Sequence, residues 1–273
     1  MAANHGFEKK QKRYKTLMQF LKNDQSSPAY YISRLLTVPH GMFTCAGGAS
    51  QAPFASLNLG YRVGDAARRV LDNRARARDV LGLRHLVSVR QVHGDRILRV
   101  DPTHLDTEPE GYDALISPLP GIGVLIQQAD CQAVLLEAPE AKVVAAVHCG
   151  WRGSVLDLIG KTIHCLRIEY GAEPAGLLAA ISPSLGPCCA EFIHYRQELP
   201  AWMHAFQVRP HHFDFWAISR KQLLDAGVLA HHIDTAGLCT RCNPQFFSYR
   251  RAHALADGVT GRNGSVIGLP SAA

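Results

Sequence analysis

The sequence predicts an α+β fold in which layers of β-sheet lie between outer helices. Short runs rich in Val, Ile and Leu gather in the middle of the chain, and turn residues separate them. Longer runs with apolar residues at helical spacing lie before, between and after these strand-like runs. From about Tyr30 onward no linker, repeat or low-complexity segment interrupts the pattern. A single layered domain is therefore expected.

Seven runs are expected to form strands and four to form helices. The expected strands are 41–45, 86–91, 97–100, 122–127, 133–137, 143–148 and 177–181. The expected helices are 66–81, 154–170, 196–206 and 218–226. In the second helix, Ser154 is expected as the N-cap residue because its hydroxyl can accept a bond from a free backbone N–H. Gly171 follows where a C-cap glycine belongs.

Residues 1–27 are expected to form a basic N-terminal extension, and residues 28–273 the globular domain. Apolar residues in the extension can form one face of a short basic helix resting on the domain. These residues are Phe7, Tyr14, Leu17, Met18, Phe20 and Leu21. The Ser26-Ser27-Pro28 segment has the composition of a linker.

Composition points to a soluble, cytoplasmic protein. The chain has 273 residues, of which 47% are hydrophobic, so it can bury a sizeable core. No apolar run reaches the roughly 18 residues needed to span a bilayer, and no signal peptide is recognisable. Eight cysteines are too few for a disulfide scaffold in a chain of this length, so reduced thiols are expected.

The formal net charge of +6 is spread over three segments. A nucleic-acid-binding protein would usually gather such an excess in one stripe. We therefore expect no nucleic-acid and no membrane partner. Small anionic ligands such as phosphate fit the charge better. The sequence does not predict an oligomeric state.

Three segments each end a strand-like run with a residue that can bind a metal ion. These residues are His93, Cys131 and His148. Imidazole and thiolate together suit Zn²⁺, and three protein ligands leave a fourth position open, as in catalytic sites. However, no local zinc-finger spacing links the three residues. From spacing alone, buried structural His and Cys residues are the commoner explanation.

Six motifs in order identify the chain as similar to the bacterial laccase-domain family, whose members are called polyphenol oxidases or purine nucleoside phosphorylases. The motifs are FTCAGGASQAPFASLNLG from Phe43, QVHGDRI from Gln91, ADCQAVLL from Ala129, AAVHCGWRGS from Ala145, ISPSLGPCCAEF from Ile181, and CTRCNPQFFSYRR with TGR from Cys239. The resemblance covers roughly residues 39–262.

The resemblance implies that His93, Cys131 and His148 are the metal ligands. It implies a single domain with an α/β/β/α sandwich, similar to the deamidase domain of cytotoxic necrotizing factor. The implied reaction is the phosphorolysis of purine nucleosides, including methylthioadenosine, together with adenosine deamination. Zn²⁺ is the implied cofactor, with Cu²⁺ as the alternative. The implied partners are purine nucleosides and phosphate.

Four further residues are candidates for the site, each with an ordinary structural alternative. Arg152 belongs to the glycine-containing segment Gly150–Gly153 that leads into a helix, and it can contact phosphate or ribose, or form a salt bridge. Asp130 can orient a ligand or carry a proton, or simply cap a turn. Asn58 can bind base or ribose, or make a turn. Arg250 can reach phosphate, or lie in a solvated C-terminal strand together with Arg251.

Several positions depart from the family pattern and put the substrate preference in doubt. Cys45 stands where the family usually has Arg. Gln132 and Ala133 replace a Leu-Pro pair after the ADC motif. Cys149 stands where Ala is frequent, and Ala252-His253 replaces the acidic residue that usually follows SYRR.

A second group of cysteines comprises Cys188, Cys189, Cys239 and Cys242. Together they have the residue types of a tetrathiolate zinc site. Adjacent cysteines on a strand point in opposite directions, however, so separate buried thiols are preferred.

Three rival functions remain open. Copper-dependent phenol oxidation could use the same His and Cys ligands, although none of the fourteen histidines forms a His-x-His pair. A metal-free hydrolase could use Cys131 as nucleophile and His148 as base, but this would leave His93 without a role. A binding protein without catalysis would be consistent with Cys45 in place of the motif Arg.

Overall fold

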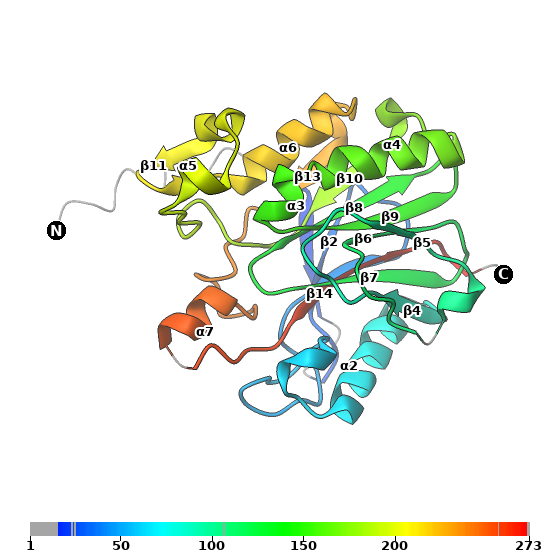
Figure 1. Ribbon diagram of the computed structural model, residues 1–273. Helices are drawn as coiled ribbons and strands as arrows, with labels where there is room; N and C mark the ends of the chain where they lie inside the picture. Colours follow the sequence, from blue (N-terminus) through cyan, green and yellow to red (C-terminus); the bar gives the residue numbers. More distant parts are fainter. Residues whose placement is uncertain (1–15, 23, 25, 106, 256, 272–273) are drawn as a thin grey trace.

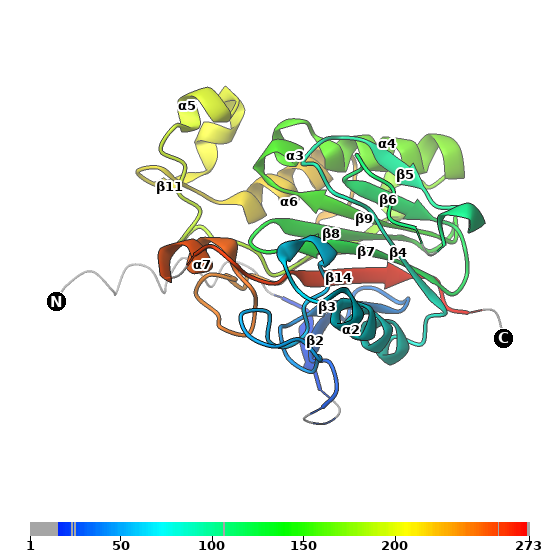
Figure 2. The ribbon, with the colours of Figure 1, turned by 60° about the horizontal axis from the view of Figure 1, so that its bottom comes forward.

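The computed structural model describes residues 16–22, 24, 26–105, 107–255 and 257–271. Two six-stranded sheets pack face to face, and helices cover their outer faces. Figures 1 and 2 show this four-layer arrangement, with α4 and α6 on one outer face and α2 on the other. The layered α+β fold predicted from the sequence is confirmed.

The first sheet has the strand order β1-β2-β3-β14-β7-β4. Its pairs are antiparallel except for β4 and β7, which are parallel. Its strands are β1 (Met18–Leu21), β2 (Tyr30–Ser33), β3 (His40–Phe43), β14 (Asn263–Gly268), β7 (Ile122–Gln128) and β4 (His85–Ser88).

The second sheet has the order β13-β10-β8-β9-β6-β5. Its strands are β13 (Ile233–Thr235), β10 (Leu178–Ile181), β8 (Gln132–Ala138), β9 (Val143–Cys149), β6 (Ala114–Ser117) and β5 (Ile97–Arg99). The antiparallel register of β8 and β9 places Ala133 opposite His148. Cys131, just before β8, is therefore brought next to His148.

The helices are short and connect or cover the sheets. The α-helices are α2 (Ala67–Val80), α3 (Trp151–Val155), α4 (Leu158–Tyr170), α5 (Tyr195–Glu198), α6 (Phe215–Asp225) and α7 (Tyr249–Leu255). The 3₁₀ turns are η1 (Tyr61–Val63), η2 (Pro102–His104), η3 (Pro174–Gly176), η4 (Ala201–Phe206) and η5 (Ala230–His232). A small hairpin joins β11 (Gln207–Arg209) to β12 (His212–Phe213). In Figures 1 and 2, α5, β11 and α7 lie toward one end of the sandwich.

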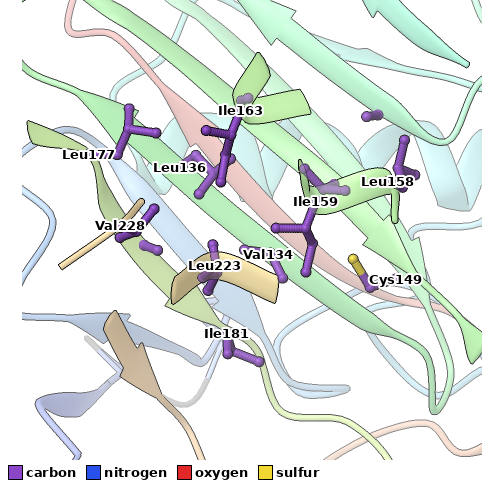
Figure 3. Close-up of a cluster of buried hydrophobic side chains, with 14 of the residues drawn as sticks. Val134, Leu136, Cys149, Leu158, Ile159, Ile163, Leu177, Ile181, Leu223 and Val228 are labelled. Atoms are coloured by element: carbon purple, nitrogen blue, oxygen red, sulfur yellow. The ribbon is translucent and has the colours of Figure 1, made fainter. Parts of the chain in front are cut away.

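Alternation along β8 explains why the middle strands read as unbroken apolar runs. Val134 and Leu136 point toward the helices, and Figure 3 shows them among Ile159, Ile163 and Leu223. Ala133 and Leu135 belong to the core between the two sheets. A strand covered on both faces buries every side chain, so its sequence loses the apolar–polar alternation of a half-exposed strand.

The predicted helix over 154–170 is divided in the structure. It becomes α3 and α4, and Asp157 rather than Ser154 caps α4, because the Asp157 carboxylate accepts a bond from Gly160 N. Asp157 has a φ of 52°, a left-handed conformation that a continuous helix cannot contain. Gly171 closes α4 with a φ of 68°, as predicted.

Two further sequence predictions are corrected by the structure. Residues 18–21 form the edge strand β1 and not a helix, because they pair with β2. The rest of the predicted N-terminal helix, with Phe7 and Tyr14, lies outside the described residues. Arg250 and Arg251 lie in α7 and not in a strand. Within the described residues, no helix is long and apolar enough to cross a bilayer.

Candidate metal centre and active site

His93, Cys131 and His148 meet at one end of the sandwich, although they are far apart in the sequence. His93 lies in the turn after β4, Cys131 in the turn between β7 and β8, and His148 near the end of β9. Their candidate ligand atoms all lie within 4.8 Å of one another. The Cys131 Sγ is 3.8 Å from His93 Nε2, and the two histidine rings pack edge to face.

The carboxylate of Asp113 positions two of the three candidate ligands. Its Oδ1 lies 2.8 Å from His148 Nδ1, and the Asp113 side chain is fully buried. It also accepts backbone hydrogen bonds from Val92, His93 and Gly94 at 2.7 to 3.1 Å. One side chain therefore orients the His148 ring and holds the turn that carries His93.

The three residues fit a tetrahedral metal ion. The bond from His148 Nδ1 to Asp113 leaves Nε2 facing the site, which is the usual carboxylate–histidine–metal arrangement. Bond lengths of roughly 2.3 Å to sulfur and 2.0 Å to nitrogen put the ligand atoms roughly 3.6 Å apart. The observed Cys131–His93 separation of 3.8 Å is close to this value.

Gly150 leaves the space that the ligands need. A Cβ at this position would lie 3.0 Å from His93 Cδ2 and 3.1 Å from Cys131 Sγ. The His93 backbone has a φ of 60°, a left-handed conformation that is uncommon for residues other than glycine. Its N–H is bonded to Asp113, so the buried carboxylate stabilises this conformation.

The Cys131 thiol and the His148 imidazole favour each other's charged forms. Burial by itself would raise the pKa of Cys131, but His148 and His93 outweigh it and lower that pKa to about 6. Burial would lower the pKa of His148, but Cys131 and Asp113 outweigh it and raise that pKa to about 9. The thiolate, which is the form that binds metal, is thus favoured near neutral pH.

A polar cavity of ≈ 440 Å³ opens on one side of the three ligands, all of which line it. Its other lining residues include Tyr61, Arg62, Arg90, Gln91, Glu108, Gln128, Tyr249 and Arg262. Burial lowers the pKa of the Arg262 guanidinium, and the neighbouring Cys131, Tyr249 and Asp130 act in the opposite direction. No carboxylate lies within ion-pair distance of Arg262 among the described residues, so its charge is available to an anion.

A second, more apolar cavity of ≈ 290 Å³ lies on the other side of His93 and Cys131. Its aromatic wall consists of Trp151, Phe192 and Phe215, and Phe192 packs against both of the others. Gln132 also lines it, and its Nε2 is buried without a hydrogen-bond partner in the described structure. His93, Cys131 and Tyr249 line both cavities. The candidate ligands therefore lie between the polar cavity and the aromatic one.

The structure brings two of the four further candidates to this second cavity. Asp130 lines it, but its carboxylate accepts bonds from Thr240 Oγ1 and Arg250 N, both at 2.7 Å. Arg250 also lines it, and one of its guanidinium nitrogens donates to Glu191 O. Asp130 thereby fixes the start of α7 next to the ligand Cys131.

The other two candidates do not reach either cavity lining. Arg152 is exposed and lies over the ring of Trp151. Asn58 is fully buried, and its amide bonds with Gly60, Asp65 and the backbone N–H of Arg262. Asn58 therefore positions the Arg262 segment.

Sequence reasoning missed Asp113, Gln128, Tyr249 and Arg262 as site residues. Arg262 belongs to the TGR motif, and Tyr249 to the SYRR motif, so the motifs pointed to the right segments but to other residues in them. Asp113 carried no local signal, because its role depends on the pairing of β6 with β9. That pairing places the start of β6 beside His148.

The chain is similar to known proteins over most of its length. Residues 39–270 match the family model described as multi-copper polyphenol oxidoreductase laccase. A protein of Deinococcus radiodurans named purine nucleoside phosphorylase is 35% identical over 86% of this chain and 90% of its own length. A Xylella fastidiosa protein of the same name is 38% identical over 75% of this chain and 83% of its own.

Solved structures share the fold. The crystal structure of YlmD from Geobacillus stearothermophilus has a TM-score of 0.83 at 30% identity, covering 94% of this chain and all of that one. The hypothetical protein YfiH of Bacillus licheniformis has a TM-score of 0.82 at 30% identity, covering 92% of this chain and 98% of its own.

Proposed function

The chain belongs to the multi-copper polyphenol oxidoreductase laccase family, and from this premise we propose that it is a metal-dependent purine nucleoside phosphorylase. Relatives that carry the name purine nucleoside phosphorylase support this function. The observation that carries the proposal is the position of His93, Cys131 and His148 between a polar and an aromatic cavity. The purine base of a nucleoside suits the aromatic cavity, and a phosphate ion suits the polar one.

The aromatic cavity suits the purine base. Trp151, Phe192 and Phe215 offer flat apolar surfaces on which a purine can stack. The unpaired Gln132 Nε2 can donate to an acceptor on the base edge, such as a ring nitrogen or O6. Gln132 departs from the usual family residue, so we propose that it sets the base preference of this chain.

The polar cavity suits phosphate. Arg262 has a half-buried guanidinium without a carboxylate partner among the described residues, and Arg90 and Arg62 line the same cavity. In phosphorolysis a phosphate oxygen bonds to C1′ of the ribose while the C1′–N9 bond breaks. The electron pair leaves with the purine, which takes up a proton. Arg262 would hold the phosphate beside C1′. The translational and rotational entropy of the phosphate would then be lost on binding and not in the chemical step.

Zn²⁺ fits the site, and His93, Cys131 and His148 would hold it while Asp113 keeps His148 in the correct orientation. When bound, the ion supplies Lewis-acid stabilisation of developing negative charge and can activate water. The second property supports adenosine deamination as an additional activity of the same site. Methylthioadenosine is proposed as a further phosphorolysis substrate. Asp130 and Arg250 are proposed to position α7, and Arg152 has no proposed contact with substrate.

Copper-dependent phenol oxidation is the second candidate, because the family description names it and a His₂Cys set also suits copper. The described residues include two clusters that could bind metal, and one of these contains no histidine. A multicopper oxidase needs several histidine-rich copper sites close together. The described site therefore favours nucleoside chemistry.

The test is a product assay with inosine and adenosine, with and without phosphate. We expect purine base and ribose 1-phosphate to appear only when phosphate is present. Arg262→Lys should raise the KM for phosphate by about tenfold or more, because Lys cannot form the bidentate contact. Arg68→Lys, at an exposed position on α2, is the matched control and should leave this KM unchanged.

Two results would argue against the proposal. Base release that does not depend on phosphate would indicate a hydrolase, and its persistence in metal-free protein would favour Cys131 and His148 as nucleophile and base. Phenol oxidation by copper-loaded protein, with no turnover of any nucleoside, would favour the laccase alternative.

A further inference from the structure

A second group of potential metal ligands lies outside the site described above. Cys188 and Cys189 come from the loop between β10 and α5, and Cys239 and Cys242 from the loop between β13 and α7. The four sulfur atoms all lie within 4.8 Å of one another. The sequence favoured separate buried thiols, but Cys242 is exposed and the structure gathers all four.

The adjacent cysteines Cys188 and Cys189 do not point in opposite directions, as they would on a strand. Cys188 and Cys189 lie in a turn and not in a strand, so their side chains need not diverge. Their sulfurs lie 3.7 and 3.5 Å from the sulfur of Cys242. Both residues of the pair therefore face the same partner.

The spacing matches that of a single tetrahedral metal ion. Zn²⁺ holds thiolates at roughly 2.3 Å, which puts neighbouring sulfurs roughly 3.8 Å apart in a tetrahedron. A disulfide would instead need two sulfurs at about 2.05 Å, and all four cysteines are unbonded. An iron–sulfur cluster, with several metal ions between the thiolates, would hold them farther apart than one ion does.

The backbone holds the two loops in the required position. Ser184 N donates to Leu238 O at 3.1 Å, and Thr240 N donates to Ser184 O at 3.0 Å. The backbone N–H groups of Gly186 and Cys242 are directed at the Cys239 sulfur. These contacts hold the Cys239 sulfur between the two loops.

Gly186 allows the close approach of the two loops. A Cβ at this position would lie 3.0 Å from Cys239 Cβ and 2.8 Å from the Trp216 ring. A side chain there would have to push the Cys239 loop away. The close contact thus depends on the one residue type that has no side chain.

We propose that Cys188, Cys189, Cys239 and Cys242 bind one structural Zn²⁺ ion, in addition to the metal held by His93, Cys131 and His148. Four protein ligands leave no open position, which is typical of structural sites. The ion would tie the loop that carries Leu185, Ala190 and Phe192 to the loop that leads into Tyr249. The first of these loops and Tyr249 at the start of α7 line the aromatic cavity, so this ion would fix the shape of that cavity.

The test is the metal content of full-length protein purified without chelator or histidine tag. We expect about two zinc ions per chain in the wild type. The double substitution Cys239→Ser/Cys242→Ser should remove one ion, and Cys131→Ser should remove the other. Cys165→Ser, a buried cysteine of α4 outside both groups, is the matched control and should retain two.

A second measurement needs only the wild type and Cys131→Ser, in case the double variant does not fold. Co²⁺ exchanged into the protein should show thiolate-to-cobalt charge-transfer bands from a four-thiolate site that persist in Cys131→Ser. One zinc ion per chain that is lost in Cys131→Ser would overturn the proposal. So would iron in place of zinc, or an intact mass reduced by the hydrogens lost on disulfide formation. None of these results depends on nucleoside turnover.

Discussion

At the scale of single residues, the proposed metal site depends on groups that would not themselves bind the ion. The Asp113 carboxylate bonds to His148 and to three backbone N–H groups of the His93 turn. Gly150 leaves room between His93 and Cys131 that no other residue could leave. Each of these residues can be altered without removing a ligand.

Asp113→Asn is expected to weaken metal binding by about 10- to 100-fold, the usual effect of removing a carboxylate partner from a histidine ligand. The amide is neutral, and it cannot accept all of the hydrogen bonds that the carboxylate accepts. Competition with a chelator of known affinity measures the effect. Asp101→Asn, at an exposed helix cap, serves as the control. Equal affinities in the two variants would contradict the role given to Asp113.

Gly150→Ala is expected to lower metal occupancy, because its methyl group would lie 3.0 Å from the His93 ring and 3.1 Å from the Cys131 sulfur. One of these ligands must then move. Elemental analysis of the purified variant provides the measurement. Gly176→Ala adds a methyl group that meets nothing within 4 Å, so it should retain full occupancy. Full occupancy in Gly150→Ala would show that the site tolerates the methyl group.

At the scale of elements, the central strands could be predicted from the sequence, but the edge strand β1 could not. The runs over 122–127, 133–137 and 143–148 match β7, β8 and β9 closely, because burial on both faces makes them apolar throughout. The edge strand β1 was mistaken for a helix, since a four-residue run carries little periodicity. The division between α3 and α4 depends on the left-handed Asp157, which the apolar spacing does not reveal.

The Glu108 carboxylate connects three elements, since it accepts bonds from Arg74 of α2, Ser88 of β4 and Gln127 of β7. Burial would raise the pKa of Glu108, but Arg74 and the other donors outweigh it and lower that pKa below its usual value of 4.5. A lowered folded-state pKa adds stability above the unfolded-state pKa. This stability is lost as the pH falls through the folded-state value.

Glu108→Gln is therefore expected to reduce the free energy of unfolding near neutral pH and to flatten its decline below about pH 4.5. Urea denaturation at several pH values between neutral and acid measures both effects. Glu173→Gln, at an exposed position, should leave the pH profile unchanged. The prediction would be contradicted if the free energy of unfolding of Glu108→Gln fell with decreasing pH as steeply as that of the wild type. The Glu108 carboxylate would then not be the source of the acid-dependent loss of stability.

At the scale of the whole molecule, the sandwich brings together ligands that local sequence does not connect. His93 follows a strand of the first sheet, whereas His148 lies in the second, and Cys131 lies in the turn that joins them. No short motif could therefore predict the site from spacing. The similarity of six motifs to a family predicted the candidate ligand set, and Arg262 and Asp113 became visible only in the fold.

The central claim is that this site performs phosphorolysis with the metal held by these three ligands. The most direct test measures bound metal and phosphate-dependent purine release in the same preparations of wild type, His93→Ala and Cys131→Ala. Metal at the His–Cys–His site and purine release should be lost together in both variants, while circular dichroism shows an unchanged fold. Full phosphorolysis in a variant that has lost this metal would contradict the account.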